Sequence, residues 1–507
     1  IMENEAAVRE TIVARASCRI RQRVEPNQGL TAYVSEKFLE ALAQQQDPHT
    51  MYFSPSLKNA FEQSLSTEGL SFGFEIDEDE DGTVEIAALS PGGPAWKSNE
   101  INIGDKVVGI ETESGPGIDL FCTTIWELRR YLSTEAPERI TLLLRKSNGQ
   151  EQQVPLIKEK VDVEENVITS FVLDGSRRVG YIYLPGFYTH WEGHNALGCA
   201  NDLAKELLKL RLEGIEGLIL DLRNNGGGSM QEALGLAGIF IDEGTLVLER
   251  QQEEDVRQLK DQNRGTAYDD PVIVMVNGMS ASASEIVAAI LQDYHRALIV
   301  GDTTYGKSTG QIIMPINAFK SDGGYLKTTV SQYYRVGGGS HQQLGVVPDI
   351  LLPERLEPLM PSEADDLTAI PADTVQKEVR FTALKPLPRE ALVLKSATRI
   401  AASSYFQEIL EARAALQQYM AAEQVYDLRP SAFITQNPGA RAAVDTSARD
   451  EMHETFAVKN TRFSETWVAL DEQRSKLNAD ERKQILGDMY IEEAFRIMLD
   501  LIAYQTP

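Results

Sequence analysis

Long apolar runs are missing from this 507-residue sequence. None reaches the roughly 18 consecutive apolar residues that a membrane-spanning helix requires. Basic residues are also scarce, with 49 Lys and Arg against 76 Asp and Glu and a net charge of −27. Nucleic-acid binding needs clustered Lys and Arg, so this balance argues against such a partner. The apolar fraction of 42% and the length instead indicate two to four globular domains.

Cysteine is rare as well. Cys18, Cys122 and Cys199 are too few and too widely spaced for a disulfide framework or a zinc knuckle. We therefore expect three packed thiols, and the cysteine count leaves the redox compartment open. The first five residues contain no cationic-then-apolar signal pattern.

Histidine and acidic clusters do not predict a metal site. His190 and His194 have the spacing of ligands on one helix face, but Glu192 is misplaced for the zinc-protease motif. The acidic run 77–82 imitates the start of a calcium loop, yet its twelfth position is Ala88 instead of Glu. We expect a solvated hairpin there, and neither metal nor other cofactor in the protein.

Composition changes along the chain divide it into four parts. Residues 1–55 show apolar residues at helical spacing and are predicted to form a helical N-terminal segment. Residues 66–160 change to short β runs with turn signals, including Asp81-Gly82 as a hairpin turn. Residues 161–355 alternate strand and helix patterns, which predicts a βαβ core, and residues 356–507 shift to long helical patterns.

Two short stretches carry candidate chemistry. Ser280, Ser282 and Ser284 follow the apolar run 271–277 and open a helical pattern. A serine at a strand-to-helix bend lies against free backbone N–H groups, as a nucleophile requires. All three serines could cap the helix, so the residues alone leave the choice open. Lys307 follows the next apolar run and could act as the base if its amine is held neutral.

Two competing interpretations use the same region. Residues 301–308 fit the phosphate-loop pattern G-x-x-x-x-G-K-[ST], but that loop must open a helix. Residues 309–315 contain Gly, β-branched residues and Pro, so we predict a strand there and no nucleotide. A Ser-His-Asp triad would need one of six scattered histidines, of which His295 is the only near candidate, and Lys307 is preferred.

The Ser-Lys pair resembles the dyad of the carboxyl-terminal processing peptidases, most closely the tail-specific proteases among them. The resemblance runs from Asp47-Pro-His-Thr50 to Val347-Pro-Asp-Ile350. Between these lie Leu184-Pro-Gly-Phe-Tyr188, Asp221-Leu-Arg-Asn-Asn-Gly-Gly-Gly228, Ser280-Ala-Ser-Ala-Ser-Glu285, Gly306-Lys307 and Gln332-Tyr-Tyr-Arg335. Several ordered motifs in one chain are more specific than any one of them.

The resemblance assigns roles to individual residues. It implies that Ser282 is the nucleophile, that Lys307 is the base and that the Gln311 amide orients the lysine. It further implies that the N–H groups of Gly227 and Ala283 form the oxyanion hole. Glycine suits this role because no Cβ stands between its N–H and the substrate oxygen.

The same resemblance implies a multidomain α+β fold. A crotonase-like α/β peptidase core would be combined with a PDZ domain, a short helical N-terminal segment and a helical C-terminal region. Arg223, Glu285 and Asp293 match family positions and are expected to orient the site instead of reacting.

Residues 66–160 resemble the PDZ domain of this family. Ser71, Phe72, Gly73 and Phe74 occupy the place of its Gly-Leu-Gly-Phe carboxylate-binding loop, with serine in place of the first glycine. The two phenylalanines either favour an apolar C-terminal residue in the ligand or belong to the core of the domain.

The resemblance implies serine endoproteolysis at or near protein C-termini, in the periplasm or envelope of a bacterium. The partners would be protein or peptide substrates with accessible apolar C-termini, with an adaptor or a second copy of the chain in addition. A second hypothesis is a PDZ peptide-binding scaffold with an inactive peptidase fold. The presence of Ser282, Lys307 and Gln311 argues against it.

Overall fold

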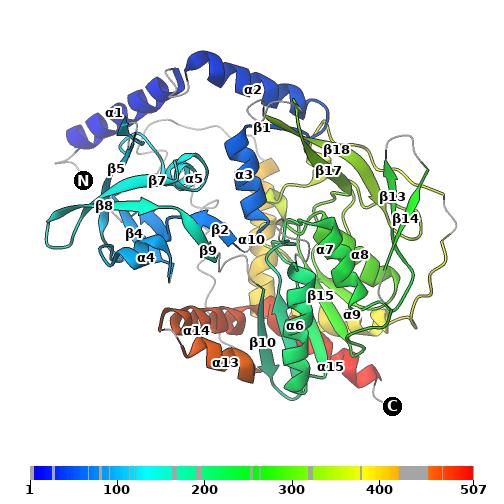
Figure 1. Cartoon of the computed structure of the whole chain (residues 1–507). Coiled ribbons are helices and arrows are strands. Elements are labelled where there is room, and N and C mark those ends of the chain that lie inside the picture. The colour runs from blue at the N-terminus through cyan, green and yellow to red at the C-terminus, as the bar shows by residue number, and fades with distance from the viewer. Residues whose placement is uncertain are drawn as a thin grey trace. The chain divides into compact units, whose positions relative to one another are not determined.

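The structure of the protein is a computed structural model. It describes residues 5–24, 29–66, 68–78, 83–90, 92–113, 115–118, 120–162, 168–189, 197–251, 255–261, 264–317, 324–376, 379–421, 455–470 and 472–505. The chain forms two compact units (Figure 1). The first comprises residues 1–166 and 311–329, and the second comprises residues 167–310 and 330–507.

Helices begin the first unit. They are α1 (Glu5–Val24), α2 (Leu30–Gln44) and α3 (Pro55–Ser64), with the short strand β1 (Met51–Phe53) between the last two. The helical spacing predicted for the N-terminal segment is confirmed over α1 and α2. Strand β1 pairs antiparallel with residues 325–327 at the start of β18 (Tyr325–Tyr334).

A six-stranded sheet forms the core of the first unit, in the order β3-β4-β5-β7-β8 with β6 paired to β5. Its strands are β3 (Phe74–Glu78), β4 (Val84–Leu89), β5 (Lys106–Thr112), β6 (Gly115–Pro116), β7 (Arg139–Arg145) and β8 (Glu151–Ile157). Alternate residues of β7, namely Ile140, Leu142 and Leu144, are buried, as a strand with one face on the core requires. The predicted turn at Asp81-Gly82 lies outside the described residues.

Two helices and a second strand pair complete this unit. Helix α4 (Pro94–Ser98) and helix α5 (Ile125–Arg130) accompany the sheet, and a π-helical turn, Tyr131–Glu135, continues α5. A capping box between Thr124 and Glu127 fixes the start of α5. Strands β2 (Glu68–Ser71) and β9 (Glu159–Asp162) pair antiparallel, with Ser71 opposite Glu159.

A seven-stranded sheet organises the second unit, in the order β19-β16-β15-β12-β11-β10-β20. Its strands are β10 (Thr169–Asp174), β11 (Arg178–Tyr183), β12 (Gly217–Asp221), β15 (Val272–Val276), β16 (Leu298–Gly301), β19 (Ile350–Leu351) and β20 (Ala457–Lys459). Strands β11, β12, β15, β16 and β19 are parallel, whereas β10 is antiparallel to both of its neighbours. The predicted βαβ alternation is confirmed.

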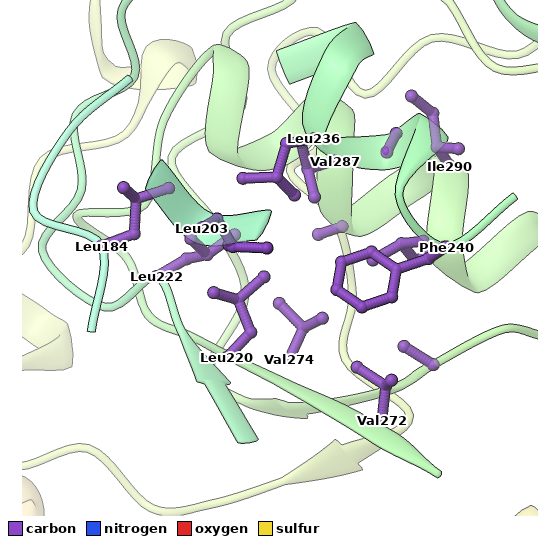
Figure 2. Close-up of a cluster of buried hydrophobic side chains, with 14 of the residues drawn as sticks. Leu184, Leu203, Leu220, Leu222, Leu236, Phe240, Val272, Val274, Val287 and Ile290 are labelled. Atoms are coloured by element: carbon purple, nitrogen blue, oxygen red, sulfur yellow. The ribbon is translucent and has the colours of Figure 1, made fainter. Parts of the chain in front are cut away.

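Hydrophobic side chains cover both faces of this sheet. On one face lie α6 (Cys199–Leu212), α7 (Met230–Gly238) and α8 (Ala283–Asp293). Figure 2 shows this cluster, in which Leu220 and Val274 from two strands point toward Leu236 and Val287 from α7 and α8. The central strands β12 and β15 are buried throughout, which is why their sequences are continuous apolar runs.

The C-terminal region covers the opposite face of the same sheet. Its helices are α9 (Arg389–Ala402), α10 (Ser404–Ala421), α13 (Arg462–Val468), α14 (Glu472–Gly487) and α15 (Met489–Gln505), with two 3-10 turns, Glu357–Leu359 and Glu363–Asp365, before them. Phe495 and Met498 of α15 pack against Ile219 and Ile273 of the sheet. The predicted helical C-terminal region is confirmed, and it supplies half of the buried residues in the hydrophobic cluster on this face.

Further strands form outside the seven-stranded sheet. Strand β13 (Thr245–Gln251) pairs with β14 (Arg257–Lys260) and with residues 331–334 of β18. Strand β17 (Thr309–Pro315) forms where a strand was predicted. Since no helix follows residues 301–308, this loop lacks the helix N-terminus of a phosphate site. In the described part of the chain, every helix is too short or too polar to cross a membrane.

The prediction of three packed thiols is wrong for two of the cysteines. Cys18 of α1 and Cys122, just before α5, form a disulfide within the first unit, and 104 residues separate them in the sequence. Only Cys199, buried in the second unit, is a free thiol. The error has a physical reason, because the spacing of cysteines in a sequence carries no information about a pairing that folding brings together.

We therefore expect the denatured, unreduced chain to contain one titratable thiol. Thiol titration in denaturant should give one equivalent without reductant and three after reduction. Cys18→Ser should raise the number of titratable thiols without reductant from one to two, because Cys122 is then free in addition to Cys199. Three equivalents in denaturant without reductant would contradict the disulfide.

Candidate functional site

The turn between β15 and α8 distinguishes the three candidate serines. Ser280 Oγ donates to the carbonyl of Leu222 at 2.8 Å, and Ser284 Oγ donates to the carbonyl of Asn225 at 2.8 Å. Both residues are fully buried, whereas Ser282 is partly exposed. Ser282 is thus the one hydroxyl of the three that a molecule from solvent can reach.

Ser282 stands directly before α8 in a strained backbone conformation. Its φ is +57°, a value that few residues with a side chain adopt. Such a conformation persists where the surrounding structure fixes it. Here the fixing contact is a hydrogen bond from the Ser282 backbone N–H to Glu285 Oε2 at 2.7 Å.

Glu285 joins this turn to the loop that carries Lys307. Its Oε2 also accepts from the backbone N–H of Lys307 at 2.8 Å. Its Oε1 accepts from Thr304 Oγ1 at 2.6 Å and from the N–H of Gly306 at 2.7 Å. The backbones of Ser282 and Lys307 therefore meet at a single carboxylate oxygen.

The Glu285 carboxylate is fully buried, and this changes its protonation. Burial raises its pKa to about 7, because a charged carboxylate loses its hydration there. The four donors act in the opposite direction and favour the ionised form. The balance brings protonation of this group close to neutral pH.

A glycine loop packs against the same turn. Gly227 has a φ of +102°, and a Cβ there would lie 2.8 Å from both the carbonyl oxygen of Ala281 and Cβ of Ser282. The position therefore requires glycine. The N–H of Gly227 donates to Asn225 Oδ1 at 2.9 Å, so in this structure it is already in use.

Helix α8 offers a second N–H beside the first. Ala283 is the first residue of α8, where the N–H has no acceptor within the helix. A Cβ at Gly227 would be 3.1 Å from this nitrogen. The structure thus brings the backbones of Gly227, Ser282 and Ala283 together, and their role as an oxyanion hole stays a prediction.

Arg223 links the glycine loop to the C-terminal region. Its guanidinium binds both carboxylate oxygens of Asp221 and donates to Asp488 Oδ2 at 2.9 Å. Tyr181 Oη donates to Asp221 at 2.8 Å, and Asp488 accepts from the N–H groups at the start of α15. Through Asp221, Arg223 therefore connects the end of β12, directly before the glycine loop, to the start of α15.

Asp293 and His295 lie at the far end of α8, roughly 16 Å along the helix from Ser282. Asp293 forms an ion pair with Arg335 at 2.6 Å. His295 Nδ1 lies 3.1 Å from the carbonyl oxygen of Leu384. The structure does not bring either side chain to Ser282, which removes His295 as a candidate base.

Gln311 and the predicted carboxylate loop belong to the first unit. The Gln311 amide donates to Thr329 Oγ1 at 3.1 Å, and Thr329 donates to Asp47 at 2.9 Å. A contact between Gln311 and Lys307 stays a prediction. In the carboxylate loop, Phe72 is a buried core residue and Phe74 packs on it, so Phe72 follows the core alternative.

Sequence reasoning missed three residues near Ser282 and Lys307. Asn225 is fully buried, accepts from Gly227, and donates to the carbonyl of Leu184 at 2.8 Å. Thr304 binds Glu285 and accepts from the N–H of Val346. His341 is buried in the loop beyond β18, and burial lowers its pKa to about 4, so it is neutral. Only Asn225, adjacent to the glycine run, carried a signal in the sequence.

The described residues contain no group of three or more His, Cys, Asp and Glu arranged to hold a metal ion. His190 and His194 lie outside the described residues.

Comparisons with known proteins match two consecutive regions of this chain. Residues 178–352 match the peptidase family S41, and residues 360–503 match the C-terminal domain of tail specific protease (DUF3340). The tail-specific protease of Haemophilus influenzae is 34% identical over 328 residues, covering 63% of this chain and 46% of that protein. This chain thus spans about half the length of that relative.

Two further proteins are similar. The chloroplastic C-terminal processing peptidase of Tetradesmus obliquus is 29% identical over 332 residues, which are 62% of this chain and 67% of that protein. Among solved structures, a photosystem II D1 C-terminal processing protease has 25% sequence identity and a TM-score of 0.37. That match covers 68% of this chain and 93% of the other.

The pKa of Glu285 predicts a pH effect on stability. A carboxyl whose pKa is higher in the folded state stabilises the fold most below its unfolded pKa, and this contribution is lost as pH rises through about 7. Between pH 5 and pH 8 the loss should be about 2–3 kcal/mol. Urea unfolding of the wild type and Glu285→Gln at both pH values measures it. Equal pH dependence in the two proteins would contradict the assignment.

Proposed function

We propose that the protein is a serine endopeptidase that cleaves other proteins at or near their C-termini. Residues 178–352 belong to peptidase family S41, and residues 360–503 belong to the C-terminal domain of tail-specific proteases. One observation carries the proposal. The buried Glu285 carboxylate binds the backbone N–H groups of both Ser282 and Lys307, so a nucleophile and a base share one support.

The reaction follows from these positions. Ser282 Oγ attacks the scissile carbonyl while the neutral amine of Lys307 takes its proton, and a tetrahedral intermediate forms. Lys307 returns the proton to the leaving amine as the C–N bond breaks. Water then attacks the acyl-enzyme, again with Lys307 as the base, and releases Ser282.

The negative oxygen of the intermediate needs N–H donors. The N–H of Ala283, at the start of α8, is available without rearrangement. The N–H of Gly227 becomes a second donor once it leaves Asn225 Oδ1. The glycine backbone permits this change, because no Cβ restricts the peptide plane.

Recognition of the substrate belongs to the first unit, whose six-stranded sheet we propose to be a PDZ domain. Its Ser71–Phe74 loop would bind a terminal carboxylate through backbone N–H groups, and the β3 edge would accept an extended peptide. Lys158 supports this assignment. Its ammonium lies 5.2 Å from the centroid of the Phe72 ring, and its hydrogen bond goes to the carbonyl of Ala136.

Among the residues that the structure describes, Lys158 forms no salt bridge, and its hydrogen bond goes to a carbonyl group instead of a carboxylate. It is half-buried, and burial lowers its pKa although Glu138 opposes that effect. A partly desolvated cation beside the loop would attract a terminal carboxylate more strongly than an exposed one would.

We further propose that the protein works in the bacterial periplasm or envelope. Disulfides persist in oxidising compartments and are rare in the cytosol of most organisms. The Cys18–Cys122 bond is therefore consistent with export. Its substrates would be proteins with accessible, apolar C-termini.

The dyad gives the first activity prediction. Ser282→Ala and Lys307→Ala should each reduce kcat by about 10³-fold or more, and the double variant should be little worse, because residues that act as one unit are not additive. His295→Ala is the control and should retain wild-type turnover of an unfolded protein with an apolar C-terminus. Full activity in Ser282→Ala would end the dyad mechanism. No turnover in the wild type would favour an inactive scaffold.

Lys158 gives the second. Lys158→Gln should lower kcat/KM roughly fivefold for a substrate with a free C-terminal carboxylate. The same substrate amidated at its C-terminus should be cleaved poorly by the wild type and be unaffected by this change. Lys97→Gln, which removes an exposed charge paired with Glu159, is the matched control. Equal cleavage of free-acid and amidated substrates would contradict recognition of the terminus.

A further inference from the structure

Strand β3 lies at the edge of its sheet, and one of its carbonyl groups faces away from the sheet. Ile76 lies opposite Ile86 of β4. The N–H of Ile86 donates to the carbonyl of Asp105, and the carbonyl of Ile86 accepts from the N–H of Gly104. Both groups of Ile86 therefore point toward β5. In an antiparallel pair of this kind, the N–H and carbonyl of Ile76 must point to the free edge. An added strand would use these two groups.

Arg129 of α5 already occupies that carbonyl. Its Nε and Nη2 donate to the carbonyl oxygen of Ile76 at 3.1 and 2.8 Å. The guanidinium of Arg129 also forms an ion pair with Asp77 at 3.3 Å. The Cζ atom of Arg129 lies 5.5 Å from the centroid of the Trp126 ring. The side chain is 42% exposed, so it can leave for solvent without losing a buried environment.

The Ser71 hydroxyl occupies a second backbone group, the N–H of Gly73, in the carboxylate loop of the proposed groove. Its Oγ accepts from the N–H of Gly73 at 3.0 Å. Gly73 is buried with a φ of +74°, and a Cβ there would lie 3.0 Å from Pro94 Cδ. The loop is therefore fixed in shape. One of the N–H groups that a terminal carboxylate would need is already satisfied by the serine hydroxyl.

Resting on the proposed function, we propose that the peptide groove is closed by this chain's own side chains, Arg129 on the β3 edge and Ser71 in the carboxylate loop, and that a C-terminal peptide binds by displacing both. A peptide N–H must replace the guanidinium on the Ile76 carbonyl, and a terminal carboxylate must replace the Ser71 hydroxyl on the Gly73 N–H. The apparent affinity is then the intrinsic affinity reduced by the fraction of molecules with an open groove.

The two contacts act on different parts of the ligand, which makes them separable. Removal of the guanidinium frees the strand edge and should tighten binding of free-acid and amidated peptides alike. Removal of the hydroxyl frees only the carboxylate loop and should tighten binding of the free acid alone. Closure of the groove would favour substrates whose C-terminus offers both an extended apolar segment and a free carboxylate.

The test measures peptide binding to the full chain, with Ser282→Ala present throughout to prevent cleavage. The probe is a fluorescein-labelled decapeptide ending in three valines, as free acid and as C-terminal amide, followed by fluorescence anisotropy. Arg129→Ala should lower Kd for both forms by about tenfold. Ser71→Ala should lower Kd for the free acid several-fold and leave the amide unchanged. Asp77→Asn, which removes only one anchor of Arg129, should act in the same direction with a smaller effect.

Arg130→Ala is the matched control, because it removes the same charge one residue along α5 and leaves the Arg129 contacts in place. Unchanged or weaker binding in Arg129→Ala and Asp77→Asn, with the unmodified groove still preferring the free acid, would overturn the closed groove and leave the proposed function intact. Absence of binding by every variant would overturn recognition of the C-terminus itself. Binding that appears only in the variants would support the closed groove.

Discussion

The buried carboxylate of Glu285 is the constraint on which the geometry of the candidate site depends. An ionised carboxylate out of water is costly unless hydrogen-bond donors replace its hydration. Four donors do so here, and they come from two separate segments, the turn before α8 and the loop of residues 304–307. Because each donor must be in place, the two segments cannot move independently. The positive φ of Ser282 is held by the same network.

The C-terminal region shares in the same positioning. Asp488 at the start of α15 binds Arg223, and Arg223 holds Asp221 at the end of β12, directly before the glycine loop. Strand β20 of this region extends the main sheet beside β10, and Phe495 and Met498 cover its second face. The region therefore completes the core of the second unit. A domain limited to residues 178–352 would expose one face of its sheet.

How much the sequence could predict depended on whether the signal was local. Strands β12 and β15 were found because they are buried on both faces and read as continuous apolar runs. The choice of Ser282 over Ser280 and Ser284 could come only from the family resemblance, because the local pattern predicts equally well that each of the three serines caps the helix. The structure separates them by burial.

Long-range pairings gave no signal at all. The Cys18–Cys122 bond, the ion pair of Arg223 with Asp488 and the pairing of β10 with β20 each join residues at least 100 positions apart. A single sequence contains no record of which distant residues meet. The hydrogen bond from Gly227 to Asn225 is local, but the sequence did not predict it either. The glycine run predicts N–H groups that face a substrate oxygen, and it gives no sign that Asn225 accepts from one of them.

Two local hydrogen bonds, one in each unit, have the same form and indicate a common physical reason. Asn225 binds the N–H of Gly227, and Ser71 binds the N–H of Gly73, in each case across two residues. A buried N–H without a partner is costly, so a loop that is to present an N–H to a ligand must satisfy it in the absence of that ligand. A short side chain two residues earlier can do this, and such local bonds are weak enough to be exchanged. Each glycine then supplies the backbone freedom that the exchange requires. In the proposed function, the N–H groups of Gly227 and Gly73 bind oxygens of the substrate, so the protein's own side chains must satisfy the same N–H groups whenever no substrate is bound.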